Sequence, residues 1–249
     1  MIITAMIALL LVSGCNKSEQ VAEQQAEKNI SVKIDFVEYE KYVKPYPTRL
    51  IVTNEFMRFD DGEGSSSYIL FDRAANTIYS VNSDERTVMS LKHKDIEVEP
   101  PFELKLEEKN LGTMKDAPTI QGLKPLHYRF SANGEACYDV VAVDGLMPDV
   151  VEAMKAFKDI LASDSKVTFN NIPADLQNAC DMSMDTFASG RHLKYGFPIQ
   201  EWSTNGDGRT LVNYDENFTP DPALFVLPED YERFSVEDIR GGTVSGGGH

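Results

Sequence analysis

The sequence predicts an α+β fold, in which helices cover one face of an antiparallel β-sheet. Three observations lead to this prediction. Short strand-like segments follow one another with Asp, Asn, Gly and Ser clusters between them, two amphipathic helical segments come late in the chain, and strands then resume. Because helices do not alternate regularly with strands, a parallel sheet built from βαβ units is not expected.

The first half of the chain carries the strand signals. Val32, Ile34 and Phe36 alternate with polar residues, as a strand with one buried face requires, and Phe102, Leu104 and Leu106 show the same alternation. Further strands are predicted at 49–59, 68–72, 77–81 and 86–91, because turn-forming residues bound each of these runs. A sheet of several hairpin-linked strands is therefore expected before residue 100.

The second half combines a hairpin, two helices and further strands. Asn133-Gly134 is a strong hairpin signal and joins strands predicted at 127–133 and 135–143. Helices are predicted from Pro148 to Leu161 and from Pro173 to about Lys194, since their apolar residues recur at helical spacing. Strands are then expected at 199–203 and 209–214, followed by an apolar run at 224–227.

The N-terminus has the pattern of a bacterial lipoprotein signal. An uncharged apolar run from Ile2 to Leu11 precedes Val12-Ser13-Gly14-Cys15, where small residues fit a peptidase cleft and the Cys15 thiol accepts a diacylglyceryl group. The run is too short to span a bilayer. We therefore expect lipidation at Cys15; the alternative is a buried N-terminal segment with an accidental cysteine.

This signal sets the expected domain organisation. A signal peptide occupies residues 1–14, a polar tether 15–30, a single folded domain 31–240 and a flexible, glycine-rich tail 241–249. The domain then faces the periplasm on a lipid anchor. Asn16 is not the Asp that commonly retains lipoproteins in the inner membrane, which favours the outer membrane, although Lys17-Ser18 resembles another retention signal.

The net charge argues against one class of binding partner, and the number of cysteines indicates a disulfide. The formal net charge is −16, so nucleic acid is a poor partner, and the membrane is contacted through the lipid. Once Cys15 carries lipid, Cys137 and Cys180 remain, and an oxidising compartment favours a disulfide between them. The alternative, a reactive or metal-binding pair, lacks a second Cys or a His within four residues of either thiol.

The chain shows no catalytic or metal-binding motif. It contains no G-x-S-x-G elbow, no P-loop and no dinucleotide-binding glycine motif, so neither an enzyme nor a bound cofactor is predicted. The run Asp60-Asp61-Gly62-Glu63-Gly64 fails the calcium-loop spacing and is expected to be a hairpin loop. The histidines lack ligand spacing and are expected at the surface or at strand edges; they are His93, His127, His192 and His249.

Flexible thioethers and aromatic rings concentrate in the helical half. Such side chains suit an adaptable apolar pocket, and at helical spacing they equally form plain core. The residues predicted to contact an apolar ligand are Met147, Met154, Phe157, Phe169, Met184 and Phe187.

Several segments resemble a family of uncharacterised proteobacterial envelope lipoproteins, which is itself distantly similar to the lipoprotein carriers LolA and LolB. The resemblance covers roughly residues 32–234 and lies in the runs 58–62, 68–73, 77–82, 86–88 and 223–228, followed by Tyr231. It implies an antiparallel sheet curved into an unclosed half-barrel, with two main helices covering its concave, apolar face. It supplies no activity.

Together these expectations give two readings of function. The first is a membrane-anchored, non-enzymatic periplasmic lipoprotein that binds an apolar ligand, such as a lipid, or a lipidated partner protein in a half-barrel cavity. The alternative is a structural or interaction module of an envelope assembly whose core is filled by its own side chains. An enzyme requires polar residues that converge in a cleft, and the sequence offers no candidate set.

Overall fold

The structure is a computed structural model that describes residues 30–62, 64–114, 118–169, 172–173 and 177–243. The predicted signal peptide, Cys15 and the tether up to residue 29 lie outside these residues, as does the tail after residue 243. Within the described segments, no helix combines the length and the apolar character that crossing a bilayer requires.

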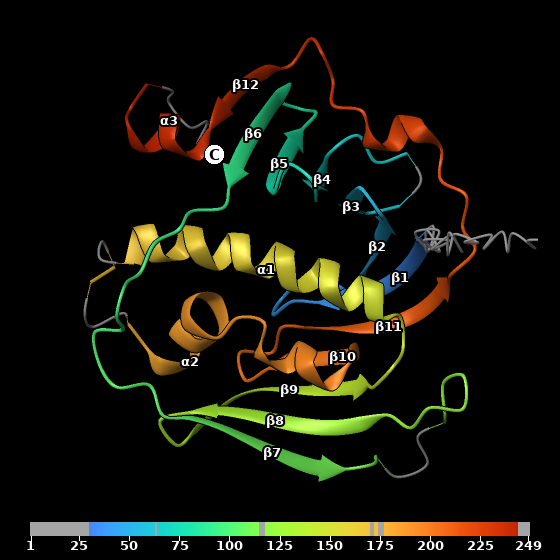
Figure 1. Cartoon of the computed structure of the whole chain (residues 1–249), viewed down its shortest axis with the longest axis vertical. Coiled ribbons are helices and arrows are strands. Elements are labelled where there is room, and N and C mark those ends of the chain that lie inside the picture. The colour runs from blue at the N-terminus through green and yellow to red at the C-terminus, as the bar shows by residue number, and fades with distance from the viewer. Residues whose placement is uncertain (1–29, 63, 115–117, 170–171, 174–176, 244–249) are drawn as a thin grey trace, which may run out of the picture.

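One large sheet dominates the fold (Figure 1). Its strands lie in the order β12-β6-β5-β4-β3-β2-β1-β11-β10-β9-β8-β7, and every neighbouring pair is antiparallel except β12 with β6. Because the edge strands β12 and β7 do not pair with each other, the sheet is unclosed. The predicted antiparallel sheet is confirmed. The strands are β1 (Ser31–Tyr39), β2 (Tyr46–Thr53), β3 (Phe56–Asp60), β4 (Tyr68–Asp72), β5 (Thr77–Asn82), β6 (Thr87–Lys92), β7 (Leu106–Gly112), β8 (Leu126–Ala132), β9 (Glu135–Val143), β10 (Phe197–Ser203), β11 (Gly208–Asp215) and β12 (Glu232–Ser235).

The alternation in β1 places its apolar side chains in the main core. Val32, Ile34 and Phe36 are buried, as predicted, while the polar residues between them are only partly covered. β1 lies at the centre of the strand order, between β2 and β11, so these side chains join the two halves of the sheet. Burial of each such side chain contributes about 2 kcal/mol to folding.

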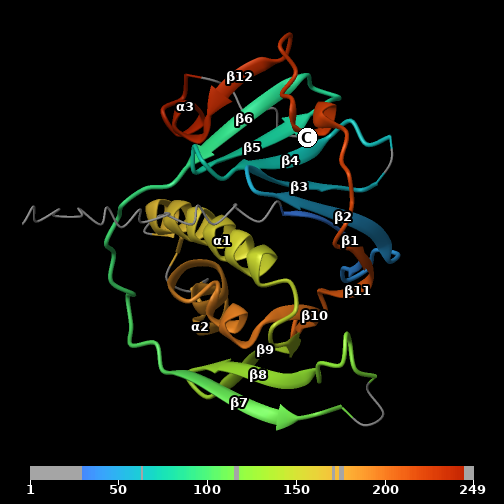
Figure 2. The same ribbon diagram turned by 45° about the vertical axis from the view of Figure 1, so that its right-hand side comes forward.

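The helix α1 (Pro148–Thr168) packs on this core. Pro148 stands in its first turn, where a missing N–H costs nothing, and Val150, Met154 and Ile160 are buried against the strands. The helix ends seven residues after the predicted Leu161, since its apolar spacing continues through Ala162. Both ribbon views show α1 lying against one face of the sheet (Figures 1 and 2).

The second predicted helix is broken into short pieces, so the expectation of one regular helix from Pro173 to about Lys194 is wrong. The pieces are α2 (Ala179–Asp181), the π-helical segment η3 (Met182–Phe187) and the 3₁₀ segment η4 (Arg191–Tyr195). Asn178 caps the first piece through a 2.8 Å hydrogen bond that its side chain accepts from the Asp181 N–H. The non-helical residues from Ala188 to Gly190 then separate η3 from η4.

Two other predictions on the strands differ from the structure. The strand predicted at 49–59 is two strands, β2 and β3, because the chain turns at Asn54-Glu55. Phe102 is 36% exposed and lies before β7, while Leu106, the first residue of that edge strand, is 42% exposed, so their alternation does not mark a buried face. The apolar run at 224–227, for which no element was predicted, overlaps a 3₁₀ turn, η5 (Pro222–Phe225).

The predicted disulfide between Cys137 and Cys180 is present. Cys137 belongs to β9 and Cys180 to α2, and their Cα atoms are 5.1 Å apart. The bond therefore attaches the helical segment after α1 to the sheet.

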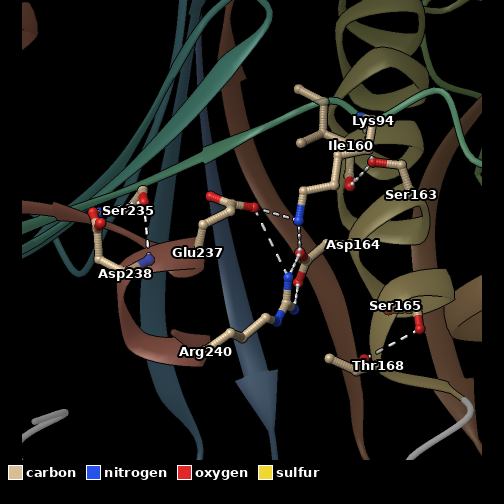
Figure 3. Close-up of polar contacts among 10 residues, drawn as sticks. All are labelled: Lys94, Ile160, Ser163, Asp164, Ser165, Thr168, Ser235, Glu237, Asp238 and Arg240. Atoms are coloured by element: carbon tan, nitrogen blue, oxygen red, sulfur yellow. Dashed lines mark hydrogen bonds and ion pairs between the residues drawn. The ribbon is translucent and has the colours of Figure 1, made fainter. Parts of the chain in front are cut away.

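The short C-terminal helix α3 (Val236–Arg240) is attached to α1 by charged side chains (Figure 3). Arg240 donates two hydrogen bonds of 2.8 and 2.9 Å to the Asp164 carboxylate near the end of α1. Lys94, which follows β6, lies 3.2 Å from Asp164 and also pairs with Glu237 of α3. Ser235 and Asp238 close a capping box at the start of α3. Hereafter Lys94, Asp164, Glu237 and Arg240 are called the α3 clamp.

Candidate ligand-binding cavity

A cavity of about 640 Å³ lies between α1, η3 and the strands β1, β3, β10 and β11. One part of its wall is apolar and the other is charged. The apolar and aromatic side chains come from α1, from η3 and from several strands, and the charged ones come from β1, β10 and β11, the helical segments after α1, two loops and one position of α1. The cavity thus offers two kinds of surface to a bound molecule.

The apolar wall follows one stripe of α1. Met154, Phe157 and Leu161 line the cavity, and their spacing of three and four residues places them on the same helix face. The Phe157 ring packs against Phe59 of β3, with 5.2 Å between centroids, and this contact fixes the stripe against the sheet. Leu161 is 40% exposed, so the apolar wall reaches solvent.

Three of the six residues predicted to contact an apolar ligand line this cavity, namely Met154, Phe157 and Met184. The other three do not. Met147 and Phe169 are each 4% exposed and belong to the packed interior, which explains their position without a ligand. Phe187 lies edge-on to Phe169, with 5.7 Å between centroids, and borders a different surface hollow.

The charged wall is organised around Glu201 of β10. Arg209 lies directly opposite on β11 and donates hydrogen bonds to Glu201 Oε2, while His192 Nε2 lies 3.0 Å from Oε1. Burial alone raises the pKa of the Glu201 carboxyl, but the charge of Arg209 and the contact with His192 outweigh it, and the pKa falls far below its usual range. Glu201 is therefore ionised and paired.

His192 lies inside the protein, so the prediction of a surface or strand-edge position is wrong for this residue. It is 3% exposed and stands edge-on to the rings of Phe130 and Tyr138. Burial lowers the pKa of the imidazole, and Glu201 opposes this effect. Among the described residues, neither ring nitrogen has a partner in hydrogen-bond geometry, although Nε2 lies 3.0 Å from Glu201 Oε1.

Lys158 brings a positive charge into the apolar stripe of α1. It lines the cavity four residues after Met154 and forms no ion pair or hydrogen bond with any residue that the structure describes. Burial lowers the pKa of its ammonium group, and the carboxylates of Glu201 and Asp185 act in the opposite direction through space.

Two further carboxyl groups of the wall have raised pKa values. Burial raises the pKa of Glu38, although Arg209 and a 3.0 Å hydrogen bond from Thr48 oppose this effect. Burial also raises the pKa of Asp185, which the nearby Asp181 reinforces. Both groups are thus easier to protonate than an exposed carboxyl.

The acidic run after β3 has a structural role. Asp60 accepts hydrogen bonds of 2.8 Å from Arg49 and 2.6 Å from Arg58, and the following residues connect the antiparallel strands β3 and β4, as expected for a hairpin loop. Within the described segments, no three His, Cys, Asp or Glu side chains gather in a way that could hold a metal ion.

Comparison with known proteins does not assign this chain to a family. The chain matches no protein-family model and no curated protein. An uncharacterized conserved protein from Thermus thermophilus aligns with 82% of this chain and 90% of its own, at 6% identity and a TM-score of 0.42. PNGF-II in a C2 crystal form aligns with 83% of this chain at 11% identity and a TM-score of 0.39, and this chain spans 31% of that protein's length. Likeness at this level identifies neither a family nor an activity.

Proposed function

We propose that the protein is a non-enzymatic, lipid-anchored protein of the periplasm that binds an apolar ligand, or the lipid of a partner protein, in this cavity. In this proposal the sheet is a half-barrel, and α1 and the α2–η3 segment cover its concave face. The observation that carries the proposal is the open volume of about 640 Å³ beside Met154, Phe157 and Met184. The resemblance to envelope lipoproteins also supports it.

The size and lining of the cavity suit a small amphiphilic molecule. Ligand pockets commonly measure roughly 300–1,000 Å³, and this cavity, whose wall holds both apolar and charged side chains, falls within that range. Methionines adapt to ligands of irregular shape because their side chains are flexible and polarisable. An interaction module with a filled core, the alternative function, offers no explanation for an open volume at this position.

The charged wall lacks the hydrogen-bonded nucleophile, histidine and acid that acyl-transfer catalysis needs. A catalytic histidine accepts a proton from a nucleophile on one ring nitrogen while an acid orients the other. His192 has the acid, Glu201, beside Nε2, but no nucleophile among the described residues is hydrogen-bonded to Nδ1. This geometry supports a binding role over a hydrolytic one.

Filling the cavity tests the proposal. Leu161→Trp places a large ring at the partly exposed edge of the apolar wall, so we expect the variant to lose any co-purifying lipid that native mass spectrometry detects on the wild-type protein. Val212→Trp is the control, because Val212 is 63% exposed on β11 and does not line the cavity. Binding that is equal in Leu161→Trp and in wild type would falsify the proposed site.

A further inference from the structure

The position of Lys158 in the cavity is not explained by packing or by pairing within the protein. Its neighbours on the helix face, Met154 and Leu161, are apolar, and an amphipathic helix normally keeps lysine off such a stripe. Lys158 is partly buried in the cavity wall, and its ammonium group makes no hydrogen bond or ion pair with a described residue, so its charge is only weakly compensated there. Such a charge is retained at a binding site when a ligand supplies the missing anion.

The acids on the same wall do not neutralise this charge directly. Glu201 is already paired with Arg209 and contacts His192. Glu38 accepts a hydrogen bond from Thr48, and Asp185 makes no hydrogen bond or ion pair among the described residues. The ammonium group of Lys158 therefore has no acceptor among the described residues, and its N–H donors are available to a bound molecule.

Three more carboxylates lie at the solvent-exposed rim and are held by local contacts. Glu40 accepts a hydrogen bond from Tyr46, Asp207 accepts one of 3.3 Å from the Lys41 N–H, and Asp181 contacts the Asn178 side chain. Charges in water at this position are screened over about 8–10 Å at physiological salt, so they oppose an incoming anion only weakly.

We propose that Lys158 binds the anionic head of an amphiphile whose apolar chain lies against Met154, Phe157 and Leu161. The shared chemistry is a carboxylate or phosphate group on an aliphatic chain. This inference rests on the proposed function, because it assigns the head group of the ligand that the same cavity takes. A ligand needs both parts to bind tightly. The ammonium group of Lys158 recognises the negative head group, and the apolar residues of α1 contact the aliphatic chain.

The head group is tested first on the wild-type protein. Isothermal titration calorimetry compares dodecanoate, dodecanol and dodecylamine, which share one chain length, with inorganic phosphate, which has no chain. We expect dodecanoate to bind about tenfold or more tightly than dodecanol, since a charge-assisted hydrogen bond is added. Dodecylamine is expected to bind more weakly than dodecanol, and phosphate is expected to give no measurable binding.

The lysine is tested with a matched pair of variants. Lys158→Met keeps an unbranched side chain and removes the charge, so dodecanoate affinity is expected to fall to that of dodecanol. Lys155→Met removes a lysine of the same helix that pairs with Glu152 outside the cavity, and its affinities are expected to stay at the wild-type values. Should Lys158→Met fail to fold, the head-group ranking of the wild-type protein still decides the inference.

The outcomes separate this inference from the function on which it rests. Dodecylamine binding as tightly as dodecanoate overturns the inference and leaves the proposed function standing, as does a Lys158→Met variant with undiminished dodecanoate affinity. Phosphate binding that depends on Lys158 without any binding of dodecanoate identifies a free-anion site and also overturns the inference. No binding of any of the three chain-bearing probes overturns the proposed function itself.

Discussion

Glu201 is the residue on which the charged wall of the cavity depends. Its carboxylate pairs with Arg209 across two strands and contacts a buried histidine from η4. Each side chain of this pair is only 18% accessible, so removal of one member leaves the other poorly solvated and without compensation, and this loss exceeds the stabilisation that the intact pair provides.

We therefore expect Glu201→Gln to lower the free energy of unfolding by about 3 kcal/mol at neutral pH. Urea denaturation measures this change. Glu152→Gln is the control, because Glu152 pairs with Lys155 at the surface, where loss of the pair costs less than about 1 kcal/mol. Equal effects of the two substitutions contradict a central role for Glu201.

The pair of Glu201 and Arg209 also makes the stability of the protein depend on pH, with stability falling in acid. The pKa of Glu201 is lower in the folded protein than in the unfolded chain, so the stability from its ionised form is present above about pH 4.3 and is lost as the pH falls below that value. Glu201→Gln has no ionised carboxylate at this position. The free energy of unfolding of this variant, measured by urea denaturation, is therefore expected to fall less steeply between pH 7 and acid pH than that of the wild-type protein.

Among the residues that line the cavity, the sequence pattern identified the apolar ones better than the charged ones. Helical spacing was enough to select Met154, Phe157 and Met184, because periodicity reports which face a side chain occupies. Glu201, Arg209 and His192 were missed, since pairing across strands depends on register. A usable signal existed: Glu201 and Arg209 flank the turn at 205–206, and a hairpin there places them opposite each other.

At the scale of elements, α1 is held from both sides. One face packs on the sheet, and the α3 clamp engages its C-terminal end through Asp164 (Figure 3). Since the cavity wall follows α1, contacts that position this helix also position Met154 and Lys158. The clamp joins segments that are far apart in the sequence, from the end of β6 to α3.

We expect Arg240→Met to release α3 from α1. The guanidinium group makes two hydrogen bonds to Asp164, so amide hydrogens of 236–240 are expected to exchange faster, while global stability falls by about 1 kcal/mol because the pair is partly exposed. Hydrogen exchange measured by mass spectrometry checks this. Arg233→Met is the control, since the Arg233 guanidinium donates its hydrogen bond to the nearby Pro228 carbonyl and not to α1.

Acid is expected to weaken the clamp in the wild-type protein. Burial raises the pKa of Asp164, but the hydrogen bonds from Arg240 and Lys94 outweigh it, so the folded-state pKa lies below that of the unfolded chain. The contribution of the clamp is therefore full at neutral pH and is lost as the pH falls below about 4. Unchanged exchange of 236–240 between pH 7 and pH 3, after correction for intrinsic rates, contradicts this expectation.

The elements also show where periodicity fails. The apolar spacing of 176–187 correctly indicates helical structure for η3. It carries no information about the break at 188–190 or about π-helical winding, because local spacing does not report that η3 packs on α1 or that α2 is disulfide-linked to β9. The alternation of Phe102, Leu104 and Leu106 predicted a half-buried strand. Nothing in a single sequence shows that this segment leads into an edge strand.

For the molecule as a whole, the proposed membrane attachment requires lipidation of Cys15, which lies outside the described residues. We expect Cys15→Ser to move the protein from the membrane fraction to the soluble fraction and to abolish incorporation of labelled palmitate in living bacteria. Cys137→Ser is the control, because its thiol is used inside the fold and its loss leaves the anchor intact. A Cys15→Ser protein that stays in the membrane fraction contradicts lipid anchoring.

The covalent bond between β9 and α2 has a practical consequence for anyone who prepares this protein. The bridge fixes the start of the segment that carries Met184, and therefore one side of the proposed ligand cavity. Material produced in a reducing cytosol is expected to lack this constraint. Affinities measured on such material are expected to understate those of the oxidised protein, because binding must then also order the loosened wall.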